Sequence, residues 1–164
     1  MLAEPGTAAG HKTSPSPLPK RKGEFAELAF ALKATELGFS VSKPFGDSES
    51  FDFILGERGR LIRNQVKSAF TSADSWGYPI NLVHNQSTAH YSPDEVDFIV
   101  AYVAPFDAWY IIPIAEVHGS NSIRLYPRGN RRGGPACLEK YREAWDQLHH
   151  QNPIEQPPSP APDE

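Results

Sequence analysis

The sequence predicts a domain of the α/β (α+β) class, with a central mixed β-sheet flanked by helices. The periodic segments occur in the order helix, several strands, helix, which is typical of this class. Two apolar runs, residues 96–104 and 108–114, have the length and composition of strands that are buried on both faces. The chain of 164 residues is long enough for one domain with its own core.

The first helix is predicted for residues 23–38, GEFAELAFALKATELG. Apolar side chains at helical spacing form one arc, which we expect to face the core. Acidic residues fall in the first turn, and Gly38 stands where a C-terminal cap belongs. The predicted arc consists of Phe25, Leu28, Ala29, Leu32 and Thr35.

The hydrophobic period then changes to two, which predicts strands. A short turn at residues 56–59, GERG, indicates that the strands on either side of it form an antiparallel hairpin. A second helix is predicted for residues 138–150, because Leu138, Tyr141, Trp145 and Leu148 share one helical stripe. The remaining predicted strands are residues 39–45, 50–55, 60–70, the neighbourhood of 78–83, and 122–127.

Proline-rich sequence marks both ends of the chain. Residues 1–19 and 151–164 contain nine of the sixteen prolines and almost no large apolar residues. Such segments cannot offset the entropy of ordering, so we predict disordered tails there and a folded domain over residues 20–150.

Charge and cysteine content narrow the setting. Residues 20–150 hold fifteen basic and sixteen acidic residues, a difference of −1, which still permits a local basic face. Cys137 is the only cysteine, so no intramolecular disulfide can form. No apolar run has the length of a membrane span or the composition of a signal peptide, so we expect a soluble, cytoplasmic protein without a membrane partner.

Asp52 is the most informative polar residue, because it lies between two phenylalanines in a predicted strand. A carboxylate there is costly unless it is paired, hydrogen-bonded or bound to a cation. Across the predicted hairpin, Gln65 and Lys67 project from one face of the strand while Val66 points the other way. Glu27, at the edge of the first helix's apolar arc, is a second carboxylate that could reach the same place.

Two carboxylates, an amide oxygen and an ammonium group suit a hard divalent cation beside a phosphate. Mg²⁺ prefers oxygen ligands and binds through one or two carboxylates together with substrate phosphate. Taken one at a time, each of these residues is more often a structural polar group, so the prediction depends on their combination. Glu24 competes with Glu27 for the role of the helix carboxylate, and a zinc site at His84 and His90 is a weaker alternative without a matching cysteine pattern.

The ordered set of motifs resembles the PD-(D/E)XK nuclease superfamily, in particular its group I intron-encoded homing endonuclease branch. The resemblance covers about residues 20–148. Two departures are that Phe51 stands where the superfamily's name has proline, and that Gln65 replaces the second acid, which is the expected form in this branch. The matching motifs are Lys22-Gly23 with Glu27, Pro44-Phe45-Gly46 with Phe51-Asp52, and Gln65-Val66-Lys67.

This resemblance implies a restriction-endonuclease-like core and a Mg²⁺-dependent DNA endonuclease that hydrolyses phosphodiester bonds, with Mn²⁺ as an alternative ion. It implies that Asp52 is the central metal ligand beside the Val66 carbonyl and the Gln65 side chain. Glu27 would act through the metal or a water molecule, and Lys67 on the nucleophile. Because one such site cuts one strand, cleavage of double-stranded DNA implies a homo-oligomer, a dimer or a tetramer.

Basic residues occur in clusters that we expect to contact DNA phosphates, although any single cluster could be solvated surface charge. Two rival functions remain open at this stage. One is a non-catalytic DNA-binding or assembly module on a nuclease fold, and the other is a resolvase-type repair nuclease. The predicted DNA-contacting residues are Lys20, Arg21, Lys22, Arg58, Arg60, Arg63, Arg128, Arg131 and Arg132.

Overall fold

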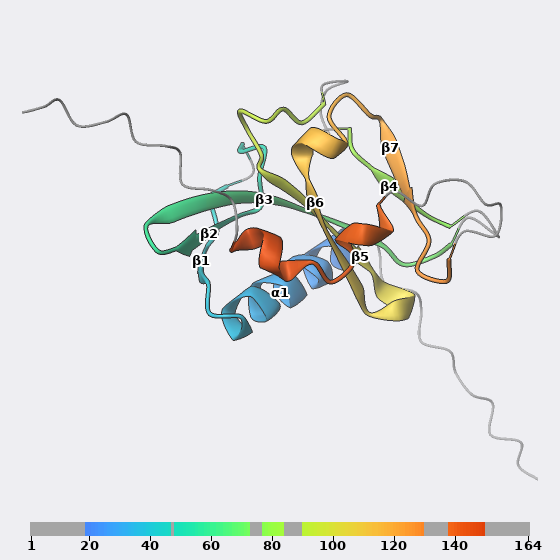
Figure 1. Cartoon of the computed structure of the whole chain (residues 1–164), viewed down its shortest axis with the longest axis horizontal. Coiled ribbons are helices and arrows are strands. Elements are labelled where there is room, and N and C mark those ends of the chain that lie inside the picture. Colours follow the sequence, from blue (N-terminus) through green and yellow to red (C-terminus); the bar gives the residue numbers. More distant parts are fainter. Residues whose placement is uncertain (1–18, 47, 73–76, 84–89, 130–137, 150–164) are drawn as a thin grey trace, which may run out of the picture.

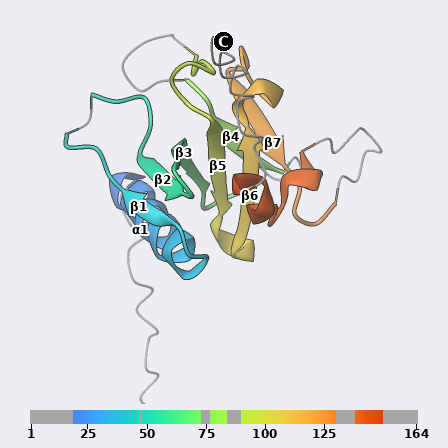
Figure 2. The same cartoon turned by 60° about the vertical axis from the view of Figure 1, so that its left-hand side comes forward.

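The computed structural model describes residues 19–46, 48–72, 77–83, 90–129 and 138–149, so both predicted tails lie outside the described residues except for Pro19. One helix, α1 (Pro19–Glu36), lies on one face of a five-stranded sheet, and a two-stranded ribbon lies on the other side (Figure 1, Figure 2). Within the described part of the chain, no helix is long and apolar enough to cross a membrane.

The five-stranded sheet has the order β1-β2-β3-β5-β6 and is mixed, as predicted. Strand β3 runs parallel to β5, whereas the other neighbouring pairs are antiparallel. The ribbon pairs β4 with β7. The strands are β1 (Ser40–Ser42), β2 (Phe53–Glu57), β3 (Arg60–Ala69), β4 (Tyr78–Asn81), β5 (Phe98–Val103), β6 (Ala108–Pro113) and β7 (Ser122–Leu125).

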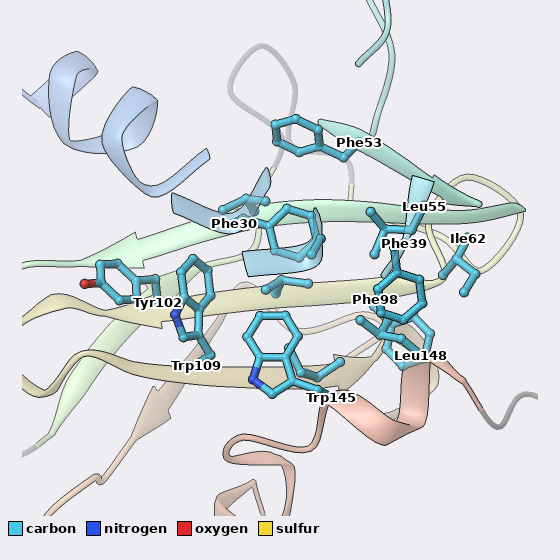
Figure 3. Close-up of a cluster of buried hydrophobic side chains, with 14 of the residues drawn as sticks. Phe30, Phe39, Phe53, Leu55, Ile62, Phe98, Tyr102, Trp109, Trp145 and Leu148 are labelled. Atoms are coloured by element: carbon cyan, nitrogen blue, oxygen red, sulfur yellow. The ribbon is translucent and has the colours of Figure 1, made fainter. Parts of the chain in front are cut away.

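The buried face of α1 differs from the predicted arc. Ala26, Phe30 and Ala34 are buried, whereas Phe25, Leu28 and Leu32 are 53%, 72% and 63% exposed. The alanines are small and let the helix lie close to the sheet, where one large side chain fills the space between them. The Phe30 ring occupies that space, with centroid distances of 5.5 Å to Phe53, 6.1 Å to Trp109 and 6.3 Å to Trp145 (Figure 3).

The ends of α1 are set by proline and glycine. The helix begins at Pro19, so Glu24 lies beyond the first turn, which contains no acidic residue, contrary to the prediction. The predicted glycine cap is confirmed: Gly38 has φ of 90°, and the Phe39 N–H donates to the Ala34 carbonyl at 3.1 Å. This bond is the one that defines a Schellman motif, and the buried Phe39 side chain accompanies it.

The β2–β3 hairpin is confirmed, with a tighter turn than the predicted four residues. Arg58 and Gly59 have φ of 48° and 82°, as a two-residue hairpin turn requires. Glu57 therefore pairs with Arg60, and Phe53 pairs with Asn64. This register brings the residue before β2, Asp52, opposite the middle of β3.

The predicted second helix is wrong. The segment forms only two short 3₁₀ turns, Glu139–Tyr141 and Trp145–Leu148. Glu143 lies between them with φ of 51°, its N–H donates to the Trp109 carbonyl at 2.8 Å, and its carboxylate accepts from the Trp109 N–H at 2.8 Å. Hydrogen bonds between this segment and the backbone of β6 thus replace the hydrogen bonds of a helix. Three of the four residues of the predicted stripe are still buried, and Leu138 is partly buried.

Candidate active site

Strand β3 has an open edge next to Asp52. The Asp52 N–H still donates to the Asn64 carbonyl at 2.9 Å, but β2 begins only at Phe53. The chain before Asp52 therefore does not continue β2 alongside β3 beyond Gln65. The Asp52 side chain takes its place: Oδ2 accepts from the Val66 N–H at 2.8 Å and from Gln65 Nε2 at 2.6 Å. A carboxylate is therefore fixed at the open edge of β3, the middle strand of the sheet, by two hydrogen-bond donors from that strand.

A cleft of about 720 Å³ opens onto this edge. It lies between the N-terminal half of α1, the loop that follows β1, and Tyr91. The cleft contains four carboxylates against two ammonium groups, so its own charge favours a bound cation. Its lining residues are Pro19, Lys20, Gly23, Glu24, Glu27, Lys43, Pro44, Gly46, Glu49, Phe51, Asp52, Gln65 and Tyr91.

Burial raises the pKa of Asp52 from 3.8 to about 6. The Val66 N–H opposes this shift, the negative charge of Glu27 adds to it, and the positive charges of Lys67 and Lys43 oppose it. The nearby donors and positive charges thus do not fully stabilise the ionised carboxylate. Such a carboxylate is expected at a cation site, because a bound cation would supply the missing positive charge.

Lys67 lies on β3 two residues beyond Gln65, on the same face of the strand. Its ammonium group is 5.0 Å from the centre of the Tyr91 ring, a cation–π contact. Burial lowers the pKa of Lys67, and Asp52 opposes that shift. Burial and the negative charge of Asp52 raise the pKa of Tyr91 to about 12, so its ring stays neutral.

Glu27 projects from α1 into the same cleft, as predicted, but it has a partner that the sequence reasoning missed. Lys43 Nζ lies 2.6 Å from Glu27 Oε2, and this hydrogen bond raises the pKa of Lys43. The position of Lys43 directly before the Pro44-Phe45-Gly46 motif is a signal that could have identified it. Glu49 and Tyr91 also line the cleft and were not predicted.

The predicted DNA-contacting residues do not form one patch. Lys20 lines the cleft, whereas Lys22 packs over the Phe70 ring at 5.4 Å. Arg58 lies in the turn between β2 and β3, and Arg60 begins β3, whereas Arg128 contacts Phe106, which follows β5. Because β3 and β5 run parallel, these two groups lie at opposite ends of the sheet. Arg21 is exposed on α1, and Arg131, Arg132 and the alternative ligand His84 lie outside the described residues.

Arg63 has a structural role. Its guanidinium donates to both carboxylate oxygens of Asp97, with Nη2 to Oδ1 at 2.8 Å, and also to the carbonyls of Asp94 and Pro93. These bonds tie β3 to the segment that leads into β5 and occupy the donors that would otherwise meet a phosphate. We therefore leave Arg63 out of the DNA-contacting set.

The oxygen atoms at the open edge of β3 are suitable ligands for a hard cation. Asp52 offers carboxylate oxygens, and the Val66 carbonyl points to the same edge as the Val66 N–H, because both groups of a strand residue lie on one side. The Gln65 amide now presents Nε2 to Asp52, so ligation through Oε1 requires the amide to turn over. The described residues contain no group of three or more His, Cys, Asp or Glu side chains placed to hold a metal. A cation at this edge would therefore also take backbone and amide oxygens.

The sequence matches the profile of the family described as PD-(D/E)XK endonuclease over residues 18–147, which is more than half of the chain. The chain belongs to this family. As a member of the PD-(D/E)XK endonuclease family, it has the restriction-endonuclease-like fold that the sequence predicted, with Gln65-Val66-Lys67 on the middle strand of the central sheet and Asp52 beside them.

Among solved structures, the chain is similar to a bacterial homing endonuclease, I-Ssp6803I. The sequences are 31% identical, the match covers 79% of this chain and 92% of the other, and the TM-score is 0.69. A crystal structure of MepB matches at 13% identity, over 70% of this chain and 94% of the other, with a TM-score of 0.42. No curated protein matches significantly. Together, the family and the homing endonuclease neighbour support a nuclease function.

Proposed function

We propose that this protein is a metal-dependent endonuclease that hydrolyses phosphodiester bonds of double-stranded DNA. The observation that carries the proposal is the Asp52 carboxylate, held at the open edge of β3 by Val66 and Gln65 and facing a cleft that Glu27 also lines. Membership of a nuclease family and similarity to a homing endonuclease support it.

Asp52, the Gln65 amide and the Val66 carbonyl would hold the cation, which we propose is Mg²⁺, with Mn²⁺ as the alternative. When bound, such an ion would polarise the phosphate and lower the pKa of a water molecule bound to it. Glu27 is placed to bind a water ligand of the ion or the ion itself. Its ion pair with Lys43 fixes the Glu27 carboxylate in the cleft before any substrate enters.

Lys67 provides positive charge close to Asp52. Since burial lowers its pKa, the ammonium group can give up a proton more readily than an exposed lysine can. It would position the attacking water and stabilise the negative charge that grows on the phosphate oxygens. The Tyr91 ring under the ammonium holds it in place.

DNA would enter the cleft with its backbone near Lys20, and Lys43 would meet the phosphates from the opposite wall. One site of this kind cuts one strand, so cleavage of both strands requires a homo-oligomer. Substrate sequence and shape would be recognised by residues outside the metal-binding edge.

A second candidate function is a DNA-binding or assembly module without catalysis. The specific observation in its favour is that Lys43 already engages Glu27 at 2.6 Å, which competes with a metal for that carboxylate. In this case Asp52 would only accept hydrogen bonds from Val66 and Gln65 and so stabilise the exposed edge of β3.

A plasmid assay separates the two functions. The full chain would be incubated with supercoiled DNA in Mg²⁺, in Mn²⁺ and in a chelator, with branched and linear DNA offered in parallel. We expect nicked and then linear plasmid in either metal and none in the chelator. Binding without cleavage in every metal would support the non-catalytic module, and a strong preference for branched DNA would indicate a resolvase-type enzyme.

A further inference from the structure

The outward face of α1 carries an unexplained apolar stripe. Phe25, Leu28 and Leu32 are spaced by three and four residues, so they lie in one row along the helix, and all three are more than half exposed. The Phe25 ring rests against Phe70 and Tyr102, at centroid distances of 6.2 Å and 6.3 Å, which anchors one end of the row. Apolar rows of this kind on soluble proteins mark places where another surface packs.

The two ends of α1 differ in charge. Basic residues, Lys20, Arg21 and Lys22, occupy the first turn, where the helix dipole favours acids. The last turn carries both Lys33 and Glu36, and Lys33 Nζ lies 3.8 Å from Glu36 Oε2. Two such helices placed antiparallel would set each basic end beside Glu36 of the other helix and away from the other basic end.

A shallow groove of about 270 Å³ runs beside the C-terminal half of the stripe. It contains three carboxylates and one ammonium group, so it is acidic and suits a basic side chain rather than a DNA backbone. Lys22 lies on the same flank of α1 as the helix residues of this groove, because the spacings from 22 to 29, 33 and 36 are close to whole turns. The groove is lined by Ala29, Leu32, Lys33, Glu36, Asp107, Trp109 and Glu143.

We propose that the outward face of α1 pairs antiparallel with the same face of a second copy of this chain. With Phe25 of one copy opposite Leu32 of the other, the two apolar stripes cover each other along the helix. In this register Lys22 of each copy lies beside Glu36 and the acidic groove of the other. The single surface supplies both members of every contact, which is the condition for a two-fold symmetric interface.

This pairing goes beyond the proposed chemistry and does not depend on it, since association can be measured without DNA or metal. The pairing also gives different roles to two basic residues of the first turn of α1. Lys22 becomes a contact between subunits, whereas Lys20, which lines the cleft, remains available to DNA.

The first test is sedimentation of the full chain over a range of concentrations. We expect a reversible dimer whose dissociation constant rises at least about tenfold in Leu28→Glu, because a charge is then buried in an apolar interface. The control is Leu61→Glu. Leu61 is 73% exposed and faces away from α1, since its neighbour Ile62 points into the core under that helix. Circular dichroism would confirm that both variants are folded.

A charge exchange tests the antiparallel register. Lys22→Glu and Glu36→Lys should each weaken the dimer, whereas the double variant should recover most of the lost affinity. A wild-type chain that stays monomeric at every concentration would overturn the proposal. So would a Leu28→Glu variant that associates as well as Leu61→Glu, or a double variant no better than the single ones. None of these outcomes affects the proposed metal-binding edge, although a monomeric wild type would also contradict the homo-oligomer proposed for cleavage of both strands.

Discussion

The Gln65 amide nitrogen lies 2.6 Å from Oδ2 of Asp52 and donates a hydrogen bond to it. The residue that replaces the second acid of the family's name therefore stabilises the first acid in the absence of a cation. An acid at position 65 would instead place two carboxylates in contact, and they would have to share a proton or bind a cation.

Gln65→Glu should accordingly make the stability of the fold depend on metal. We expect the variant to unfold at a lower temperature than the wild type in chelator and to gain more from added Mg²⁺ or Mn²⁺, because a carboxylate is the stronger ligand for a hard cation. Thermal unfolding across a metal titration measures this. An identical response of both proteins to metal would remove residue 65 from the proposed ligand set.

Asp52→Asn should stabilise the metal-free protein at neutral pH. The amide oxygen can still accept from the Val66 N–H and Gln65, while the buried charge is lost. Since the pKa of Asp52 is raised from 3.8 to about 6, the ionised side chain opposes folding by up to about 3 kcal/mol above pH 6.

The pH dependence of that difference has a definite sign. Below the unfolded pKa of 3.8 the wild-type side chain is neutral in both states, so the advantage of Asp52→Asn should vanish there and grow as pH rises to about 6. Denaturant unfolding of both proteins in chelator across this range would show it. A variant that is less stable than the wild type at neutral pH would mean that Asp52 is a structural acceptor.

Glu27 and Lys43 should shift the pH dependence of metal binding in opposite directions. The negative charge of Glu27 raises the pKa of Asp52, and the positive charge of Lys43 lowers it. Metal binding needs ionised Asp52, so wild-type affinity should fall as pH drops through about 6. The fall should begin at lower pH in Glu27→Gln and at higher pH in Lys43→Met, as measured by calorimetric titration with Mn²⁺. Shifts in the same direction would contradict this electrostatic account.

Lys67→Ala should slow cleavage by at least about a hundredfold while DNA binding changes little, because the ammonium acts on the nucleophile and the developing charge. Lys140→Ala is a matched control, since Lys140 is an exposed lysine that pairs with Glu116 at 3.6 Å. Single-turnover cleavage rates of the two variants measure the difference. Equal rates would assign Lys67 to packing against Tyr91 alone.

The sheet was predictable from the sequence because its strands carry strong signals. The runs that became β5 and β6 are apolar throughout, and the turn between β2 and β3 contains the glycine that a tight hairpin needs. The helix face was not predictable from hydrophobicity alone. Small Ala26 and Ala34 are buried because they permit close approach to the sheet, while larger Leu28 and Leu32 lie outside.

The C-terminal segment shows a second limit of pattern reasoning. The apolar spacing of this segment suits a helix, but it also suits an irregular chain that packs on the sheet through single residues. The hydrogen bonds between Glu143 and Trp109 hold the segment in the second arrangement. Among the site residues, Asp52, Gln65, Val66 and Glu27 do meet at one edge or cleft. The position of Lys43 before a family motif marks it as a candidate, but its pairing with Glu27 was not predictable, because the distance depends on how the loop after β1 folds back over α1.

The most direct test of the central claim is cleavage by Asp52→Asn. If Asp52 anchors the catalytic cation, this variant should bind DNA about as tightly as the wild type, because phosphate contacts come from other residues, yet cleave at least about a hundredfold more slowly in Mg²⁺ and in Mn²⁺. Binding and single-turnover cleavage would be measured on the same linear duplex. A variant that binds and cleaves DNA like the wild type would contradict the assignment of Asp52 as the metal-binding centre.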